Sequence, residues 1–333
     1  MADTMKNEMI YGLLVHLGRN MWGDDTAADH VRCDETVWNE ITEHMADVRA
    51  NMLVIDLGEA LEYPSHPELK VEGTWSVAKM KAEIARLKAM GIEAIPKLNF
   101  SACHDLWLKE YRRMHSTPEY YKVVADVIRD TAETFGHPRF LHLGWDEEKE
   151  KAQRKGYAYM AIRQGDLWWK DMLFTAEEAK KNGMRPWIWS DKEWMAKDEF
   201  MAKCPRDIVQ SQWYYSPFFG GKWEVRDQPL MDKHYREDYV ENYTLCVFKE
   251  LADAGFDQIC CGSNIYHHNN FHDLVRHCLK TVPRERLLGF LNAPWGEVAA
   301  NDKWGGGAGD RGKYLDAVDQ LAGARGMVER RFK

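Results

Sequence analysis

Residues 140–148 read FLHLGWDEE, a short apolar run that ends in a glycine, an aromatic residue and three consecutive carboxylates. Apolar runs of this length are typical of strands that are buried on both faces of a parallel sheet. Neighbouring carboxylates repel each other, most strongly where water is scarce. The stretch therefore indicates a buried strand with acid chemistry at its end, or alternatively a solvated acidic start to the next helix.

The same pattern recurs along the chain, and each apolar run is followed by residues with helical periodicity. The eight runs span residues 10–17, 52–57, 92–98, 140–143, 186–189, 208–213, 258–264 and 287–293. The clearest helices are expected at residues 76–90, 118–135, 159–182, 239–254 and 315–330. Eight strand-then-helix units in succession predict an α/β fold, a single closed (β/α)8 barrel over residues 1–333.

Residues typical of helix ends support these expected helix boundaries. Thr117 and Pro118 are typical of a helix start, and Gly136 is typical of a helix end. Segments 214–238 and 299–312 are irregular and rich in Trp, Gly and Asp. We expect these two segments to be long loops over the mouth of the barrel.

Composition excludes several classes of partner. The net charge is −8 with acids and bases interspersed, so we expect no nucleic acid. No segment approaches the roughly 18 apolar residues of a membrane span, and residues 1–9 contain no apolar signal region. The seven cysteines form no CxxC pair, which favours reduced thiols and a cytoplasmic location.

Barrels of this type place their active sites at the C-terminal ends of the strands. In this sequence those positions are crowded with carboxylates, imidazoles and aromatic rings. Burying so many charged groups is costly without partners, which argues that they serve more than stability. They include His16, Asp56, Lys97, Asn99, Asp146, Glu147, Trp189, Asp191, Trp213, Tyr266, Trp295 and Glu297.

Residues 142–147, HLGWDE, resemble the His-x-Gly-Gly-Asp-Glu motif of glycoside hydrolase family 20, the β-N-acetylhexosaminidases. The similarity continues along nearly the whole barrel, from the first strand with Arg19 to the final Trp295-Gly296-Glu297. The chain departs from the family where Trp145 replaces the second glycine, which we expect to place a large ring beside the acids. Its third strand also lacks the usual acidic residues.

The resemblance implies a catalytic pair, Asp146 and Glu147. Glu147 would protonate the leaving oxygen, and Asp146 would stay ionised while the substrate's own 2-acetamido oxygen attacks the anomeric carbon. We expect Asp146 and the surrounding indoles to raise the pKa of Glu147. The implied substrate-binding residues are Arg19, His104, His142, Trp145, Trp189, Trp213, Tyr266, Trp295 and Glu297.

The predicted partner is therefore a carbohydrate, an oligosaccharide or glycoconjugate, and no cofactor is expected. Among these residues, His142 has an alternative role, which we favour, as a hydrogen-bonding residue inside the barrel. The sequence leaves the oligomeric state open. A homodimer is compatible with it, because barrels of this kind often pair through helices or long loops.

The residues leave other mechanisms open. The seventh strand ends in GSNIY, residues 262–266, with no acid, which speaks against a conventional nucleophile there. The nucleophile then comes from the substrate or from Asp56, Asp191 or Glu297. A non-catalytic carbohydrate-binding barrel is a further alternative.

A metal-dependent barrel hydrolase or sugar isomerase is another class that fits these residues. Its ligands would come from His16, Asp56, His142, His267, His268 and His272. Because the first strand has no His-x-His pair and a vicinal His pair rarely chelates one ion, we expect no metal.

Overall fold

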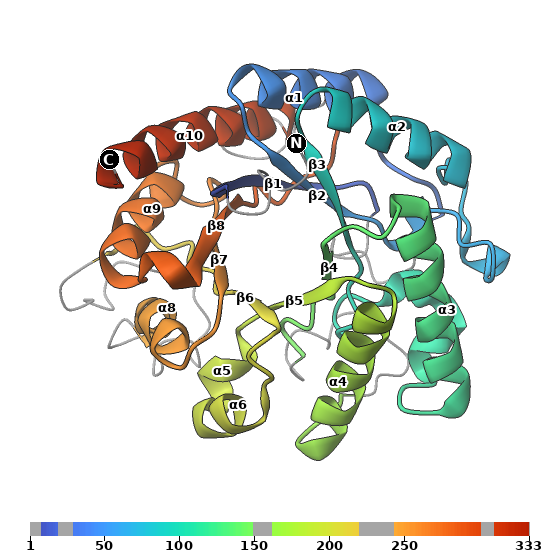
Figure 1. The fold of residues 1–333 in the computed structure, drawn as a ribbon. Helices are drawn as coiled ribbons and strands as arrows, with labels where there is room; N and C mark the ends of the chain where they lie inside the picture. The colour runs from blue at the N-terminus through green and yellow to red at the C-terminus, as the bar shows by residue number, and fades with distance from the viewer. Residues whose placement is uncertain (1–7, 19–28, 149–161, 220–242, 301–309, 333) are drawn as a thin grey trace.

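Eight parallel strands form a closed barrel in the order β1 to β8, as the ribbon in Figure 1 shows. This confirms the predicted (β/α)8 fold. The computed structural model describes residues 8–18, 29–148, 162–219, 243–300 and 310–332. The strands are β1 (Ile10–His16), β2 (Met52–Asp56), β3 (Glu93–Lys97), β4 (Phe140–His142), β5 (Arg185–Trp189), β6 (Val209–Ser211), β7 (Gln258–Gly262) and β8 (Leu287–Asn292).

Helices surround the strands on the outside of the barrel. The described helices include none with the length and apolar content needed to cross a lipid bilayer. They are α1 (Glu35–Asp47), α2 (Val77–Ala89), α3 (Pro118–Phe135), α4 (Asp166–Lys181), α5 (Lys192–Met195), α6 (Lys197–Lys203), α8 (Tyr243–Asp253), α9 (Asn270–Thr281) and α10 (Asp310–Arg331).

Strands β1 and β2 are mostly apolar because both of their faces are buried. Every residue of β1, β2 and β7 is buried. Leu14 and Val54 belong to one apolar cluster, whereas their neighbours Leu13 and Leu53 belong to a second. Alternation along a strand sends one set of side chains inward and the other toward the helices. Seven of the predicted runs contain an observed strand, and β5 begins at Arg185, one residue before its run.

Local sequence explains where helices begin and end. The Thr117 hydroxyl accepts from the Tyr120 backbone N–H at the start of α3, and Gly136 ends it with a φ of 69°. The predicted end of α4 near Asn182 is confirmed, but its predicted start was wrong, because residues 162–164 are not helical and the helix begins at Asp166, preceded by Gly165 with a φ of 53°. Helix α10 begins at Asp310, earlier than expected, so the end of the predicted loop 299–312 is helical.

Parts of three other predictions lie outside the described residues. They are residues 220–238 and 301–309 of the expected loops, together with 239–242, where a helix was expected to begin. Helix α8 is described from Tyr243 onward.

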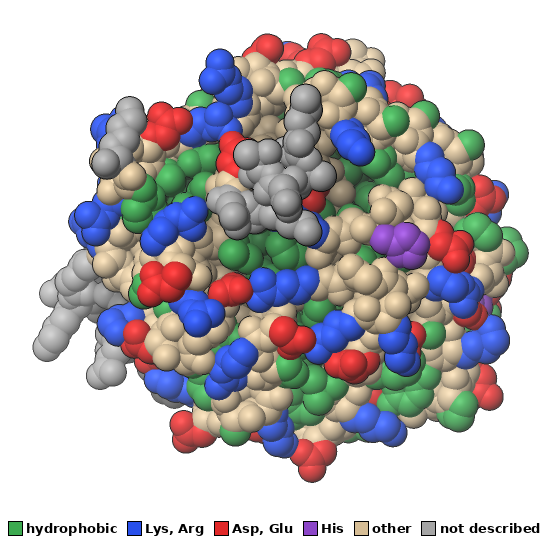
Figure 2. All heavy atoms as spheres, in the orientation of Figure 1, with side chains coloured by type: hydrophobic (Ala, Val, Ile, Leu, Met, Phe, Trp, Pro, Cys, Tyr) green, Lys and Arg blue, Asp and Glu red, His purple; other side chains and the backbone are tan. Residues whose placement is uncertain are grey.

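Acidic and basic side chains are interspersed over the face in Figure 2, and in its described part neither charge gathers into a stripe. Binding of a nucleic-acid backbone requires clustered positive charge. This face therefore offers no continuous basic surface.

The third carboxylate of the acidic run has a structural partner. The Glu148 oxygens accept from Arg163 Nε and Nη2, both at 2.8 Å. Arg163 also donates to Asp171 at 3.2 Å, and its guanidinium lies 4.4 Å from the Trp145 ring centroid. All of these groups are buried. Glu148 therefore joins the chain after β4 to the residues that precede α4.

Replacing Arg163 tests this buried ion pair. Arg163→Met should lower the free energy of unfolding by about 3–5 kcal/mol, because it leaves buried carboxylates without a cation. Urea denaturation measures the change. As a control, Lys249→Met removes the exposed Lys249–Asp253 pair and should cost less than about 1 kcal/mol. Equal losses in the two variants would contradict the structural role of Arg163.

Candidate active site

A pocket at the C-terminal ends of the strands brings residues from five strand ends together. Two carboxylates follow β4, and aromatic or apolar side chains from β5, β6, β7 and β8 complete the wall. A pocket of two acids and several flat rings suits a polar ring-shaped ligand. Its lining residues are Asp146, Glu147, Trp189, Trp213, Tyr215, Ile265, Tyr266 and Trp295.

The aromatic wall has a deep end and an open end. Trp189 and Trp295 are 1% and 8% exposed, and their ring centroids lie 5.9 Å apart. Tyr266 is 69% exposed. The two tryptophans therefore form the floor of the pocket, and Tyr266 stands at its mouth.

Sequence reasoning missed Tyr215, which stacks on Trp213 at a centroid distance of 5.0 Å. Its neighbour Tyr214 points elsewhere, with its hydroxyl donating to the Phe218 carbonyl and its ring buried. Alternation along the extended segment places Trp213 and Tyr215 on one side. Applying that period beyond the end of the predicted strand would have identified Tyr215.

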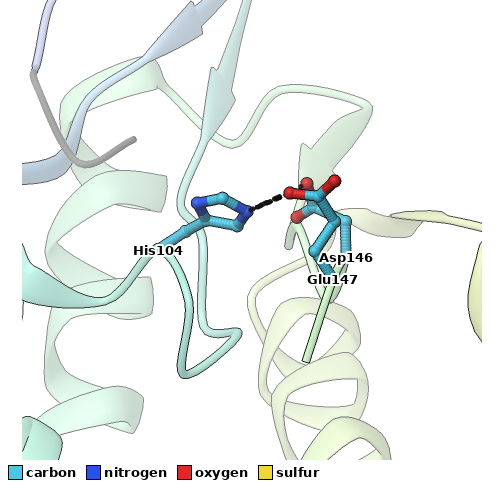
Figure 3. A group of neighbouring side chains, drawn as sticks. All are labelled: His104, Asp146 and Glu147. Atoms are coloured by element: carbon cyan, nitrogen blue, oxygen red, sulfur yellow. Dashed lines mark ion pairs between the residues drawn. The ribbon is translucent and has the colours of Figure 1, made fainter. Parts of the chain in front are cut away.

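The two acids share one histidine (Figure 3). His104 Nε2 lies 3.3 Å from Asp146 Oδ2 and 3.4 Å from Glu147 Oε2. The Asp146 side chain is 7% exposed, and that of Glu147 is 34% exposed. Asn99 Nδ2 donates to Asp146 Oδ1 at 2.7 Å. Asp146 is thus the deep, fully partnered acid, while Glu147 faces the opening.

The charges of Asp146 and His104 stabilise each other. Burial alone would raise the pKa of Asp146, but the nearby His104 charge and the bond from Asn99 outweigh it and lower the pKa to about 2. Burial alone would lower the pKa of His104, but the Asp146 carboxylate outweighs it and holds the pKa well above 6.5. Asp146 is therefore an anion and His104 a cation at neutral pH.

The backbone that carries the acids is held from both sides. The φ angles of Gly144, Trp145 and Glu147 are 72°, 70° and 56°, a backbone conformation that residues other than glycine rarely adopt. A Cβ on Gly144 would lie 2.0 Å from Asn99 Oδ1, so only glycine fits there. Asn99 Oδ1 accepts from the Trp145 N–H, and Asp191 Oδ2 accepts from the Glu147 N–H at 2.8 Å.

Trp145 does not lie where we expected. Its indole N–H donates to Thr175 Oγ1 at 3.0 Å, its ring packs edge-on against Trp168, and it is 1% exposed. The positive φ at Trp145 sends the ring into the core beside α4. This corrects the expectation that Trp145 stands beside the acids and contacts substrate.

His142 also lies below the pocket. Its Nδ1 accepts from the Gly144 N–H at 3.1 Å, and its ring packs against Trp187 and Trp189 at 4.7 and 4.6 Å. This position agrees with the supporting role inside the barrel.

Two other predicted contacts, His104 and Glu297, are not among the described residues that line the pocket. The Glu297 carboxylate pairs with Arg32 at 3.4 Å. Arg19 lies outside the described residues. His104 contacts both acids, as described above.

The carboxylates considered as nucleophiles are committed to other partners. Asp56 Oδ2 lies 2.5 Å from Lys97 Nζ and 3.2 Å from His16 Nδ1, and all three residues are buried. Asp191 accepts from the Glu147 backbone. Neither lines the pocket, and Glu297 does not either. Within the described residues, the pocket therefore holds no acid besides Asp146 and Glu147.

Among the described residues, those weighed as metal ligands form no single cluster. His268 Nδ1 lies 3.3 Å from Asp316, and His272 Nε2 lies 3.2 Å from the Gln320 carbonyl. Across the described part of the chain, only one group of histidine, cysteine or acid side chains has its ligand atoms close enough together to hold an ion, all within 4.8 Å of one another. That group is His104, Asp146 and Glu147.

Comparison with known proteins places this barrel among characterised folds. No protein-family model matches the chain, and no curated protein matches its sequence. A family 20 β-N-acetylglucosaminidase from Vibrio harveyi, solved with N-acetylglucosamine, superposes with a TM-score of 0.58 at 15% identity. The match covers 95% of this chain and 58% of the Vibrio chain, so this chain spans under two thirds of that enzyme.

Two further solved structures have the same fold. The β-N-acetylhexosaminidase from Bacteroides fragilis NCTC 9343 gives a TM-score of 0.58 at 13% identity, over 96% of this chain and 70% of its own. Dispersin B gives 0.60 at 14% identity, over 95% and 98%. The expected likeness to family 20 barrels is therefore confirmed for the fold, and identities this low carry no further conclusion.

The mutual dependence of Asp146 and His104 gives a pH signature. The contribution of ionised Asp146 to the free energy of unfolding is present above its ordinary pKa of 3.8 and is lost as pH falls through about 2. That of His104 is present below 6.5 and is lost as pH rises through its raised pKa. The stability advantage of the wild type over His104→Gln should therefore be largest between pH 3.8 and 6.5. Urea unfolding across pH measures it, and a constant gap would contradict the coupling.

Proposed function

We propose that the chain is a glycoside hydrolase that removes terminal β-linked N-acetylhexosamine by substrate-assisted, retaining catalysis. One observation carries this proposal: a buried acid paired with a histidine and an outward-facing acid stand side by side in an aromatic pocket. The fold supports it, because the solved barrels it resembles include a β-N-acetylglucosaminidase and a β-N-acetylhexosaminidase. A fold alone does not specify a reaction, so the chemistry of the site has to carry the argument.

The two acids have different roles, which follow from their different depths in the pocket. Glu147, toward the opening, gives its proton to the glycosidic oxygen as the bond to the anomeric carbon breaks. The acetamido oxygen of the substrate forms the new bond to that carbon, and a cyclic cation results. Asp146 stays an anion, accepts from the acetamido N–H and balances the positive charge. Water then attacks the anomeric carbon, the bond from that carbon to the acetamido oxygen breaks, and Glu147 takes a proton from the water.

Burial of Asp146 supports its role as an anion. A deep carboxylate would ordinarily become neutral. Here His104 and Asn99 hold it ionised, with a pKa near 2. A buried ionised acid beside a second acid that faces the opening is the pair of groups that this reaction needs.

The aromatic walls support a sugar as the ligand. Trp189 and Trp295 offer flat indole faces at the pocket floor, and Trp213 and Tyr215 form a stacked pair beside them. Such faces pack against the apolar side of a sugar ring, while the acids meet its polar groups. We assign Trp189, Trp213 and Trp295 to sugar contact on this basis.

A panel of nitrophenyl glycosides tests the function. We expect cleavage of N-acetyl-β-hexosaminides and at least about 100-fold slower cleavage of the matching sugars with a 2-hydroxyl, since these lack the nucleophile. Equal rates on both would exclude substrate assistance. Sugar binding without cleavage would favour a binding protein.

Glu147→Gln tests the acid. The variant should lose about 10²–10⁴-fold in kcat on unactivated substrates, because the amide has no proton to give. Circular dichroism should show an intact fold. Glu177→Gln makes the same change on an exposed helix position and should keep full activity. Activity near wild type in Glu147→Gln would remove this residue from the role.

A metal-dependent reaction is a second candidate, favoured by the one ligand group that the described residues form. Carboxylate and imidazole ligands suit zinc or manganese. Incubation with EDTA decides between the candidates. We expect activity to remain unchanged, whereas loss with EDTA and recovery with zinc or manganese would favour the metal.

A further inference from the structure

A carboxylate outside the pocket determines how Glu147 is held. Asp191 follows β5, is 1% exposed and does not line the pocket. Its Oδ2 accepts the backbone N–H of Glu147 at 2.8 Å. The contact joins the loop after β5 to the turn after β4, the neighbouring strand in the barrel.

Glu147 needs such support because of its backbone. Its φ of 56° is in the left-handed region, which costs a non-glycine residue on the order of 1–2 kcal/mol. A charged hydrogen bond to its N–H can offset that cost and fix the direction of its Cα–Cβ bond. The direction of this bond decides whether the carboxylate meets His104, which lies 3.4 Å away.

Asp191 is placed to cap a helix, but its side chain does not do so. Asp191 occupies the N-cap position of α5, where an aspartate ordinarily accepts from its own helix. No side-chain cap bond is present at that helix start. The carboxylate reaches across to Glu147 instead.

We propose that Asp191 is a positioning residue for the general acid. It acts through the backbone of Glu147, as Asn99 acts on the other side through the Trp145 N–H and the Asp146 carboxylate. This inference rests on the proposed function, since it assigns Asp191 to the proton-donating step. It also removes Asp191 from the candidates for a nucleophile.

Leaving groups of different basicity test the proposal. A sugar leaving group needs a proton from Glu147, whereas 2,4-dinitrophenolate leaves without one. Asp191→Ala should lower kcat/KM about 100-fold on N,N′-diacetylchitobiose and less than about threefold on 2,4-dinitrophenyl N-acetyl-β-glucosaminide. Asp191→Asn keeps an acceptor oxygen of the same size and should stay within about threefold of wild type on both.

Two kinetic outcomes would overturn the proposal. The first is equal loss on both substrates in Asp191→Ala, which means a general effect on the pocket. The second is an Asp191→Asn variant as impaired as Asp191→Ala. As a matched control, Asp34→Ala removes the carboxylate that caps α1 through the Thr36 N–H at 2.8 Å. It should lower the melting temperature and leave the ratio of the two rates unchanged.

Crystal structures of the variants separate this proposal from the proposed function. In Asp191→Ala the Glu147 carboxylate should leave its place beside His104, and in Asp191→Asn it should stay. An unmoved Glu147 in Asp191→Ala would overturn the proposal whatever the activity. If the wild type cleaves no glycoside, the proposed function fails and this measurement still decides the role of Asp191. If Asp191→Ala does not fold, Asp191→Ser, whose hydroxyl is too short to reach, replaces it in both experiments.

Discussion

The ion pair between Asp146 and His104 is the interaction on which the site depends. A carboxylate that is almost fully buried would be too costly to keep ionised without a cation close by. His104 supplies that cation 3.3 Å away, and Asn99 adds a hydrogen bond. Its neighbour Glu147 is more exposed and faces the opening of the pocket. The aromatic walls matter because they keep water from weakening this arrangement.

Most of the fold could be predicted because its causes are local. Strands such as β1 and β2 are mostly apolar because both of their faces are buried, and α3 begins after Thr117 and ends at Gly136 through interactions within a few residues. The acid pair was also visible, since consecutive carboxylates after an apolar strand are unusual. What failed was the start of α4, where Arg163 binds Glu148 across 15 positions of sequence. Residue type does not disclose a partner at that distance.

Side-chain direction was the other limit. Trp145 was expected beside the acids, yet its left-handed backbone turns the ring into the core. Tryptophan and glutamate seldom adopt that conformation, so nothing in their identity predicts it. The contacts that support it come from Asn99 and Asp191, which follow β3 and β5, the strands on either side of β4. Only the closed barrel brings those strands together, and the site's geometry is therefore a tertiary property.

Beneath the pocket floor, Asp56 and Lys97 form a fully enclosed pair, with His16 against Asp56 and also packed on Trp295. Removing either member alone would leave a lone charge in the barrel interior, whereas replacing both with apolar residues of similar size can be neutral. Each single substitution in this layer is therefore expected to destabilise the protein, even where the double substitution does not. A related barrel is expected to hold both charges or neither, and anyone redesigning the pocket from below has to exchange the two positions together.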